Sequence, residues 1–368
     1  MSQTNIGVGS TLAVRRWGTS LAKDTEKQVY FSRFIGQGEN NMIERKVELE
    51  SDAGDTVQFD LSMRLKGGVV TGDNRVEGNT SNLTFLSDEI KIDQARKGVD
   101  TGGRMTRKRT LHNLRTISRD RVAEYMAQWT DEMIFAYLSG DAGLTAANED
   151  RVFGVQNFAG NPLQAPDQYH HVFPNGVTSK AGLTVADKMS VALIEKVSTM
   201  PRMMNAKNPD LVNMSPVTVD GGKYFVLLMN PWQEHDLRTE TGELSWSKIA
   251  QAAATAEGRK SPIFKGGMGM INNTVLHKHE SVLRWRDAGA GANVHMARSL
   301  FLGRQAGVIA YGSAGNGARM SWYEKSADAG NRVEIYCGAI MGMKKTRFGG
   351  YDFGAVAVDT AARDPVAA

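Results

Sequence analysis

The sequence predicts an α+β fold in which an extended β-hairpin and one long helix stand out. Apolar and polar residues alternate strictly over residues 56–66, which is the period-two pattern of a half-buried strand. From Leu111 to Ala136, apolar residues recur every three or four positions, the period of a helix with one buried face. Continuous apolar runs at 224–229 and 333–343 are typical of buried strands. Together these runs predict a mixed fold.

The composition is that of an ordinary folded protein. The 368 residues are enough for two or three domains, and 41% of them are hydrophobic and 23% charged. The net charge of +4 is mild for this size and does not indicate a dedicated nucleic-acid binder. The single cysteine, Cys337, excludes an intrachain disulfide and is compatible with synthesis in a reducing cytoplasm. Because the sequence has neither a signal-peptide pattern nor an apolar run of transmembrane length, we expect a soluble, non-secreted protein without a membrane partner.

Residues 1–53 are expected to form an N-terminal arm. They show no long helical period, yet they contain Trp17, Tyr30, Phe31 and Phe34. A segment with so many aromatic side chains is expected to lie across another surface, because burying large aromatic rings is much lower in free energy than leaving them in water. Trp17 and Phe34 are therefore candidate contacts between copies of the chain.

Residues 54–103 are expected to form an extended loop built on a β-hairpin. The apolar row of its first strand consists of Val57, Phe59, Leu61, Met63 and Leu65. Gly67-Gly68 and a polar stretch make a long tip, and the second strand runs near Ile90 and Ile92. Arms of ten residues would project roughly 30 Å. A two-stranded hairpin alone is only marginally stable in water, so we expect a second copy of the chain to cover the apolar row.

Residues 91–121 form a basic segment, with ten lysines and arginines against three aspartates. Such a run often lies on a solvated face, but it can also dock on acidic patches of a neighbour or face a polyanion. The candidates for such a contact are Arg104, Arg107, Lys108 and Arg109. The long helix is predicted over about 107–139 and ends at Ser139-Gly140, a typical C-terminal stop. With roughly 40 Å of length it forms a spine along one edge of the molecule.

The rest of the chain is predicted to combine loops, short helices and strands. Turn signals make 141–183 loop-like, and Thr184 is a candidate cap for a helix that Pro201 ends. Two further helices are expected, at 246–257 and 298–311. The strand at 224–229 is ended by Asn230-Pro231, and closing strands are expected at 333–343 and 353–358.

Few residues suggest catalysis. On a strand, His277 and His279 would point to the same face, with Glu280 or His295 as a third metal ligand. A metal-dependent hydrolase is therefore an alternative, and a polyanion-binding protein is another. His170-His171 lies among turn signals and is expected on a solvated loop. Because the glycine-rich stretches lack phosphate-loop spacing and Cys337 lies in an apolar strand pattern, we expect no cofactor and no enzymatic activity.

Short motifs along nearly the whole chain point to one family. They are Trp17, Phe34-Ile35-Gly36, Gly54-Asp55, Glu77-Gly78-Asn79, Ile92-Asp93-Gln94, the runs 223–231, 262–269 and 297–303, Lys344-Lys345 and Asp352-Phe353-Gly354. In this order they resemble the major capsid proteins of tailed bacteriophages, which share the Hong Kong 97 capsid fold.

The resemblance implies a division of the chain. It implies an arm over 1–53, an extended loop over 54–103 and a peripheral domain with the spine helix over 104–183. An axial domain over 184–320 and return strands of the peripheral domain over 321–368 complete the chain.

The resemblance also implies partners. The protein is expected to self-assemble into hexamers and pentamers of an icosahedral shell around double-stranded DNA. The short arm has no heptads, so we expect a separate scaffolding protein, together with a portal and decoration proteins. The shell is expected to be assembled in the host bacterial cytoplasm and to become the capsid of the virion.

Overall fold

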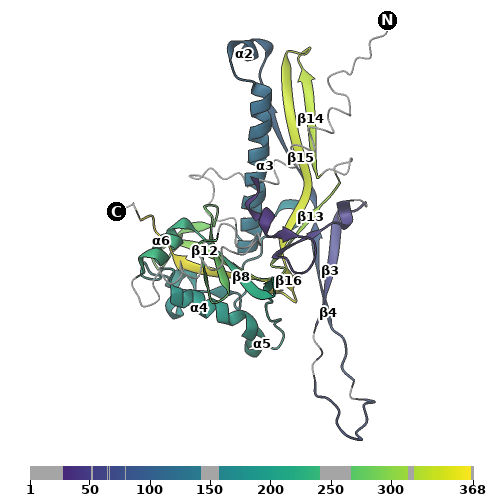
Figure 1. Ribbon diagram of the computed structural model, residues 1–368, viewed down its shortest axis with the longest axis vertical. Coiled ribbons are helices and arrows are strands. Elements are labelled where there is room, and N and C mark those ends of the chain that lie inside the picture. The colour runs from purple at the N-terminus through teal and green to yellow at the C-terminus, as the bar shows by residue number, and fades with distance from the viewer. Residues whose placement is uncertain are drawn as a thin grey trace.

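The computed structural model describes residues 28–50, 53–63, 65, 67–78, 80–141, 157–240, 267–313 and 319–365. The molecule is elongated (Figure 1). The spine helix α3 (Leu114–Ser139) runs towards one end beside a long hairpin of β14 (Met320–Ala327) and β15 (Arg332–Lys345). The hairpin of β3 (Thr56–Ser62) and β4 (Phe85–Lys91) projects at the other end. The predicted combination of an extended hairpin, a long helix and sheets is confirmed.

The first sheet supports the spine helix. Its order is β1 (Ile35–Gly36), β2 (Ile43–Lys46), β13 (Gly307–Tyr311), β15 and β14, and β5 (Asp93–Asp100) also pairs with β15. The stretch 93–100 thus belongs to this sheet and not to the projecting hairpin, because its whole length pairs with β15 from Glu334 to Met341. We refer to β5, β15 and β14 as the spine sheet.

The second sheet forms the body beside the spine. Its order is β6 (His171–Val172), β18 (Ala355–Ala361), β12 (Val294–Leu302), β8 (Gly222–Met229), β10 (Thr274–Lys278) and β9 (Gly269–Ile271). The strand β11 (Arg284–Ala288) pairs with β12, and β7 (Val217–Val219) pairs with β8. The short pair β16 (Arg347–Phe348) and β17 (Tyr351–Asp352) links the two sheets along the chain.

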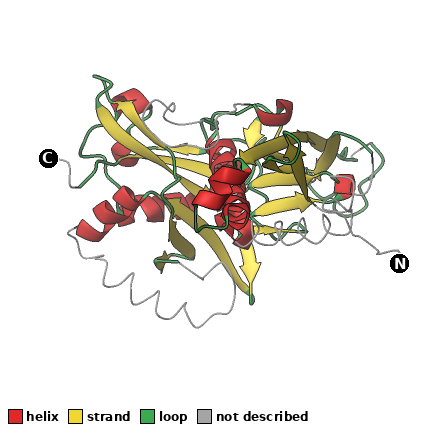
Figure 2. Cartoon of the chain, turned by 90° about the horizontal axis from the view of Figure 1, so that it is seen from above, coloured by secondary structure: helices red, strands yellow, loops and turns green. Residues whose placement is uncertain are grey.

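Among the residues that the structure describes, the helices outside the spine are short. They are α2 (Arg104–Arg109), α4 (Val191–Thr199), α5 (Met204–Lys207) and α6 (Pro231–Thr239). Six 3-10 turns lie in the described residues, at η1 (Tyr30–Arg33), η2 (Glu48–Glu50), η3 (Phe158–Gly160), η4 (Pro174–Gly176), η5 (Lys180–Gly182) and η6 (Met200–Met203). Figure 2, which looks down the long axis, shows the short helices around the strands of the body. No helix among the described residues is long and apolar enough to span a bilayer.

The spine helix ends where the sequence predicts. Gly140 follows Ser139 in the left-handed conformation, with φ 75°, and its N–H donates to the carbonyl of Ala136 at 2.9 Å. A Cβ on Gly140 would lie 2.0 Å from the carbonyl oxygen of Gln164, so only glycine fits there. The prediction of one continuous helix over about 107–139 is wrong at its start, because residues 110–113 between α2 and α3 are not helical. The side chain of Asn113 accepts the N–H of Thr116 and begins α3.

Two other predicted helices differ in the structure. The stretch 298–311 is not a helix but lies in β12 and β13, joined by a turn with Gln305 at φ 53°. Both strands are buried on both faces, so their apolar runs carry no period that separates strand from helix. The helix expected from Thr184 begins at Val191 instead, where Ser190 Oγ accepts from Leu193 N. The helix expected at 246–257 lies outside the described residues.

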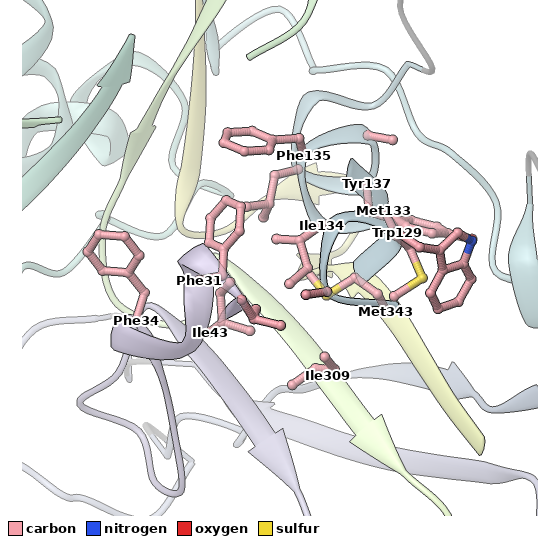
Figure 3. Packing of buried hydrophobic residues seen from close by; sticks show 14 of the residues in the cluster. Phe31, Phe34, Ile43, Trp129, Met133, Ile134, Phe135, Tyr137, Ile309 and Met343 are labelled. Atoms are coloured by element: carbon pink, nitrogen blue, oxygen red, sulfur yellow. The ribbon is translucent and has the colours of Figure 1, made fainter. Parts of the chain in front are cut away.

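The described part of the arm packs on its own chain (Figure 3). Phe31 and Phe34 are both buried in the core: the ring of Phe31 lies 4.7 Å from that of Phe135 on α3, and the ring of Phe34 lies 6.1 Å from that of Phe31. The carboxylate of Asp131 on α3 accepts the N–H of Tyr30 at 2.7 Å and of Phe31 at 3.1 Å, which fixes η1 to the spine. Phe34 is therefore a core residue with little surface left for a neighbouring copy, whereas Trp17 lies outside the described residues.

Candidate assembly surfaces

The root of the projecting hairpin is anchored in its own chain. Val57 and Ile90, which face each other across β3 and β4, are buried with Leu49, Val308 and Ala310. The side-chain amide of Asn161 donates to the carbonyl of Lys91 at 2.7 Å, and its oxygen accepts the N–H of Lys91 at 3.0 Å. Val57 thus belongs to the subunit core, in contrast to its expected contact with a second copy.

The apolar row becomes more exposed along the hairpin. Phe59 is half-buried, with its ring 6.0 Å from that of Phe348. Leu61 and Met63 are half-buried in a groove that the hairpin forms with Leu211 and Phe353. The exposed fraction then rises to 65% at Leu65. The tip adds the exposed side chains Val69, Val76, Leu83 and Phe85. The uncovered apolar surface is therefore at the far part of the hairpin.

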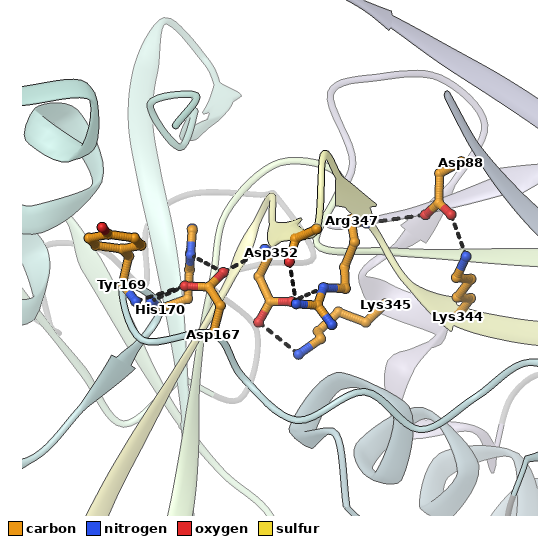
Figure 4. A network of polar contacts seen from close by, with 9 residues as sticks. Asp88, Asp167, Tyr169, His170, Lys344, Lys345, Arg347 and Asp352 are labelled. Carbon is orange, nitrogen blue, oxygen red and sulfur yellow. Dashed lines mark hydrogen bonds and ion pairs between the residues drawn. The ribbon is translucent and has the colours of Figure 1, made fainter. Parts of the chain in front are cut away.

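An ion pair fixes the hairpin to the first sheet (Figure 4). The carboxylate of Asp88 on β4 pairs with the ammonium of Lys344 and accepts the N–H of Arg347 at 3.2 Å. Lys344 Nζ also donates to the carbonyl of Glu89 at 2.9 Å. Because Asp88 and Lys344 are both nearly buried, removing one leaves the other without compensation.

The polar network continues into the body. Lys345 Nζ pairs with Asp352 at 2.7 Å, and the N–H of Asp352 donates to Asp167 at 2.7 Å. Burial pushes the pKa of Asp167 up, but hydrogen bonds from His170 and from backbone N–H groups outweigh it and lower the pKa to about 2. The expectation of a solvated His170-His171 loop is wrong, because His170 is fully buried with Nδ1 2.8 Å from Asp167.

We expect Asp88→Asn to loosen the hairpin. The amide keeps the shape of the side chain but leaves the Lys344 ammonium without its counter-charge, at a cost of about 2 kcal/mol. Hydrogen exchange of the backbone amides in β3 and β4 should become faster. Asp60→Asn, an exposed carboxylate on the same hairpin, is the matched control and should leave exchange unchanged. Equal protection in both variants would contradict a role for the ion pair.

A second buried ion pair joins the spine helix to the body. Arg298 on β12 donates from Nε and Nη2 to the two oxygens of Asp359, each at 2.7 Å. Its Nη1 donates at 2.9 Å to the carbonyl of Ser139, the last residue of α3. His171 adds a contact of 2.7 Å to Asp359. One guanidinium thus holds the helix end and the second sheet together.

At the basic end of the spine, two of the four candidate cations bind carbonyl groups of the same chain. Arg104 Nε donates to the carbonyl of Gly330 at 3.2 Å, and Arg107 donates to that of Asn331 at 3.0 Å, both in the turn between β14 and β15. Lys108 and Arg109 are exposed. Of the four candidate cations for a polyanion or an acidic patch, these two present their charge most openly.

The candidate metal ligands lie in an aromatic part of the core. His277 is fully buried 5.4 Å from the ring of Phe34, and His279 lies 4.3 Å from the ring of Tyr30. His279 Nδ1 accepts the N–H of Ser281, and burial lowers the pKa of the imidazole. In the part of the chain that the structure describes, no group of three or more His, Cys, Asp or Glu side chains is placed to hold a metal ion. Packing against the aromatic rings of the arm accounts for the burial of these two histidines.

Comparisons with known proteins agree on one family. A family model described as "Phage capsid protein" matches residues 5–364. The major capsid protein of Pseudomonas phage KPP25 is 26% identical over 353 residues, which cover 90% of this chain and 89% of that protein. The capsid structure of Ralstonia phage GP4 is 49% identical, with a TM-score of 0.84 and 99% of both chains covered.

A more distant structure shares the fold. The capsid of cyanophage Pam1 is 21% identical with a TM-score of 0.69, covering 91% of this chain and 93% of that one. The expected Hong Kong 97-like α+β fold is thus confirmed. With a match over nearly its whole length, this chain belongs to the phage capsid protein family.

Proposed function

We propose that copies of this major capsid protein form hexamers and pentamers of an icosahedral head shell, and that the projecting hairpin of each copy lies on a neighbour. The observation that carries this proposal is the far part of the hairpin. Five large apolar side chains between Leu65 and Phe85 are exposed on a slender hairpin that projects from the body (Figure 1), and the part near Leu65 still borders a groove with Leu211. So many exposed large apolar side chains on one projecting segment favour an interaction site there.

Burial of the tip gives assembly its driving force. Covering several hundred Å² of apolar surface at about 25 cal/mol per Å² yields several kcal/mol per contact before the cost of ordering. In the apolar row of the first hairpin strand, Leu61, Met63 and Leu65 remain available for contact with a neighbouring copy. Trp17 is a further proposed contact. Many such contacts around a closed shell make the assembly stable although each is modest.

The proposed partners follow from this role. A separate scaffolding protein, a portal and decoration proteins would act with the shell, which would be assembled in the host cytoplasm around non-specifically held double-stranded DNA. The simplest test is negative-stain imaging of the purified chain, alone and with its scaffolding protein. Closed shells of uniform size are expected; a chain that stays monomeric under all these conditions would contradict the proposal.

We further propose that the basic spine end faces DNA or an acidic patch on a neighbour. The double variant Lys108→Glu/Arg109→Glu removes two exposed cations, which should lower the slope of DNA affinity against salt by about 2 on logarithmic axes. DNA content of purified particles should fall in parallel. The control Lys196→Glu/Lys207→Glu changes two exposed cations of the body and should leave both measurements unchanged. Unaltered DNA binding and packaging in the first variant would contradict DNA contact.

A further inference from the structure

A cluster of basic side chains lies on one side of the body, where β11 and β12 pair. Trp285 and Met296, which face each other across these strands, both lie in a buried apolar cluster. Because side chains alternate along a strand, their neighbours Arg284 and His295 lie on the opposite face. Arg286 follows at the point where the register shifts, and its side chain is exposed. The strand pair thus brings two guanidinium groups close to one imidazole.

The chain that follows β18 adds a third guanidinium. The N–H of Ala362 donates to the carbonyl of His295 at 2.9 Å, so the exposed Arg363 leaves the sheet beside this histidine. On the other side, the guanidinium of Arg284 lies over the ring of Trp232 on α6, 4.6 Å from its centroid. In Figure 1, α6 lies on the side of the body away from the spine helix, so this cluster is separate from the basic spine end.

Two of the three guanidinium groups have no partner of their own. Within the described part of the chain, neither Arg286 nor Arg363 makes a hydrogen bond or an ion pair. Asp287, the carboxylate next to Arg286, pairs with Lys180 at 2.6 Å instead. Five N–H donors on each free guanidinium therefore remain available for a ligand.

The state of His295 reflects this positive surrounding. Burial and, after it, the charges of Arg286, Arg363 and Arg284 lower the pKa of its imidazole. The same charges repel a metal cation, so the place does not suit the role of third metal ligand considered for His295. An anion, in contrast, would relieve the repulsion between the guanidinium groups.

We propose that Arg286, Arg363 and His295 bind a phosphate-type anion. The planar guanidinium offers paired N–H donors that match the oxygens of a phosphate, and the two arginines reach the imidazole from different segments of the chain. A neutral imidazole adds one further N–H donor. The phosphate is either a free anion or part of a nucleic-acid backbone. The inference goes beyond the proposed function, because the site is complete within one copy and needs no contact between copies.

Isothermal titration of the full-length subunit with pyrophosphate, at neutral pH in a chloride buffer, tests the site. Saturable binding of one anion per chain is expected. Arg286→Gln/Arg363→Gln should weaken the affinity by at least about tenfold, because charge-assisted hydrogen bonds are lost. Both side chains are exposed, so the variant should keep the thermal midpoint of the wild type. The matched control Lys196→Gln/Lys207→Gln removes two exposed cations elsewhere on the body and should bind like the wild type.

Two further measurements define the ligand. Arg286→Lys/Arg363→Lys keeps the charges but not the paired donors, so its affinity should lie between those of the wild type and the glutamine variant. Displacement of pyrophosphate by a short DNA duplex would assign the phosphate to nucleic acid, and no displacement would assign it to a free anion. Non-saturable binding, full affinity in the arginine-to-glutamine variant, or an equal loss in the lysine control would each overturn the inference, while shell formation stands.

Discussion

Deleting residues 66–82 is expected to give a subunit that folds but does not form normal particles. The deletion removes the far end of the hairpin with the exposed Val69 and Val76, but it leaves the root residues Val57 and Ile90 and the Asp88–Lys344 pair in place. Circular dichroism and the thermal midpoint of the isolated subunit should therefore stay close to the wild type. In negative-stain images, closed shells of normal size should fall below about a tenth of the wild-type number, because each contact loses several kcal/mol.

A second variant separates the effect of the apolar side chains from that of the hairpin's length. Val69→Ser/Val76→Ser/Leu83→Ser keeps the full hairpin but removes three exposed apolar side chains, so it should also reduce particle yield. Thr80→Ala/Asn82→Ala changes two polar positions of the same tip and serves as the matched control. Normal shells from the deletion would show that the tip is dispensable and that other surfaces drive assembly.

Arg298→Met is expected to give the largest loss of subunit stability. The substitution leaves the fully buried carboxylate of Asp359 without its partner and the carbonyl of Ser139 without its donor. Breaking a buried pair in this way costs about 3–5 kcal/mol. For a chain of this size the midpoint of thermal unfolding should fall by roughly 4–6 °C. Arg298→Lys keeps the charge but not the bidentate geometry, so its unfolding midpoint should lie between those of the wild type and Arg298→Met.

The pH dependence of this loss has a defined sign. In the wild type, burial alone would raise the pKa of Asp359, but the Arg298 guanidinium outweighs it and holds the pKa below the ordinary 3.8. Its stabilisation is therefore present above about pH 4 and is lost as the pH falls through the lower folded value. In Arg298→Met the His171 contact remains but the guanidinium, the largest opposing influence, is lost, so the pKa of Asp359 rises and the penalty shrinks in acid.

Thermal unfolding of the isolated subunit between pH 4 and pH 8 checks this sign. The midpoints of wild type and Arg298→Met should converge towards pH 4 and separate towards pH 8. A difference that is constant with pH would mean that lost packing, for example against Trp285, accounts for the effect rather than the unpaired carboxylate.

The sequence predicted elements whose signal is local. The alternation of β3, the apolar period of α3 and the stop at Gly140 depend on neighbouring residues, and the structure confirms them. The stretch 298–311 was predicted as helix because strands that are buried on both faces show no alternation.

Contacts between distant residues could not be predicted from the sequence. Asp88 and Lys344 are separated by 256 positions, and Arg298 and Asp359 by 61, so no local pattern joins them. Two lysines at the end of an apolar strand, Lys344 and Lys345, were the one sign that buried carboxylates would be needed there. The aromatic arm was correctly expected to be covered, but its described part lies on the core of its own chain and not on a neighbour.

The lone thiol has a practical consequence for studying this shell. Cys337 is buried beneath the spine helix, and burial raises its pKa to about 12, so at neutral pH it stays protonated and inert towards maleimides. The native chain is therefore a ready background for site-specific fluorophores or spin labels. A dye at the hairpin tip and another on the body would report, in real time, whether the distance between them changes as a particle closes.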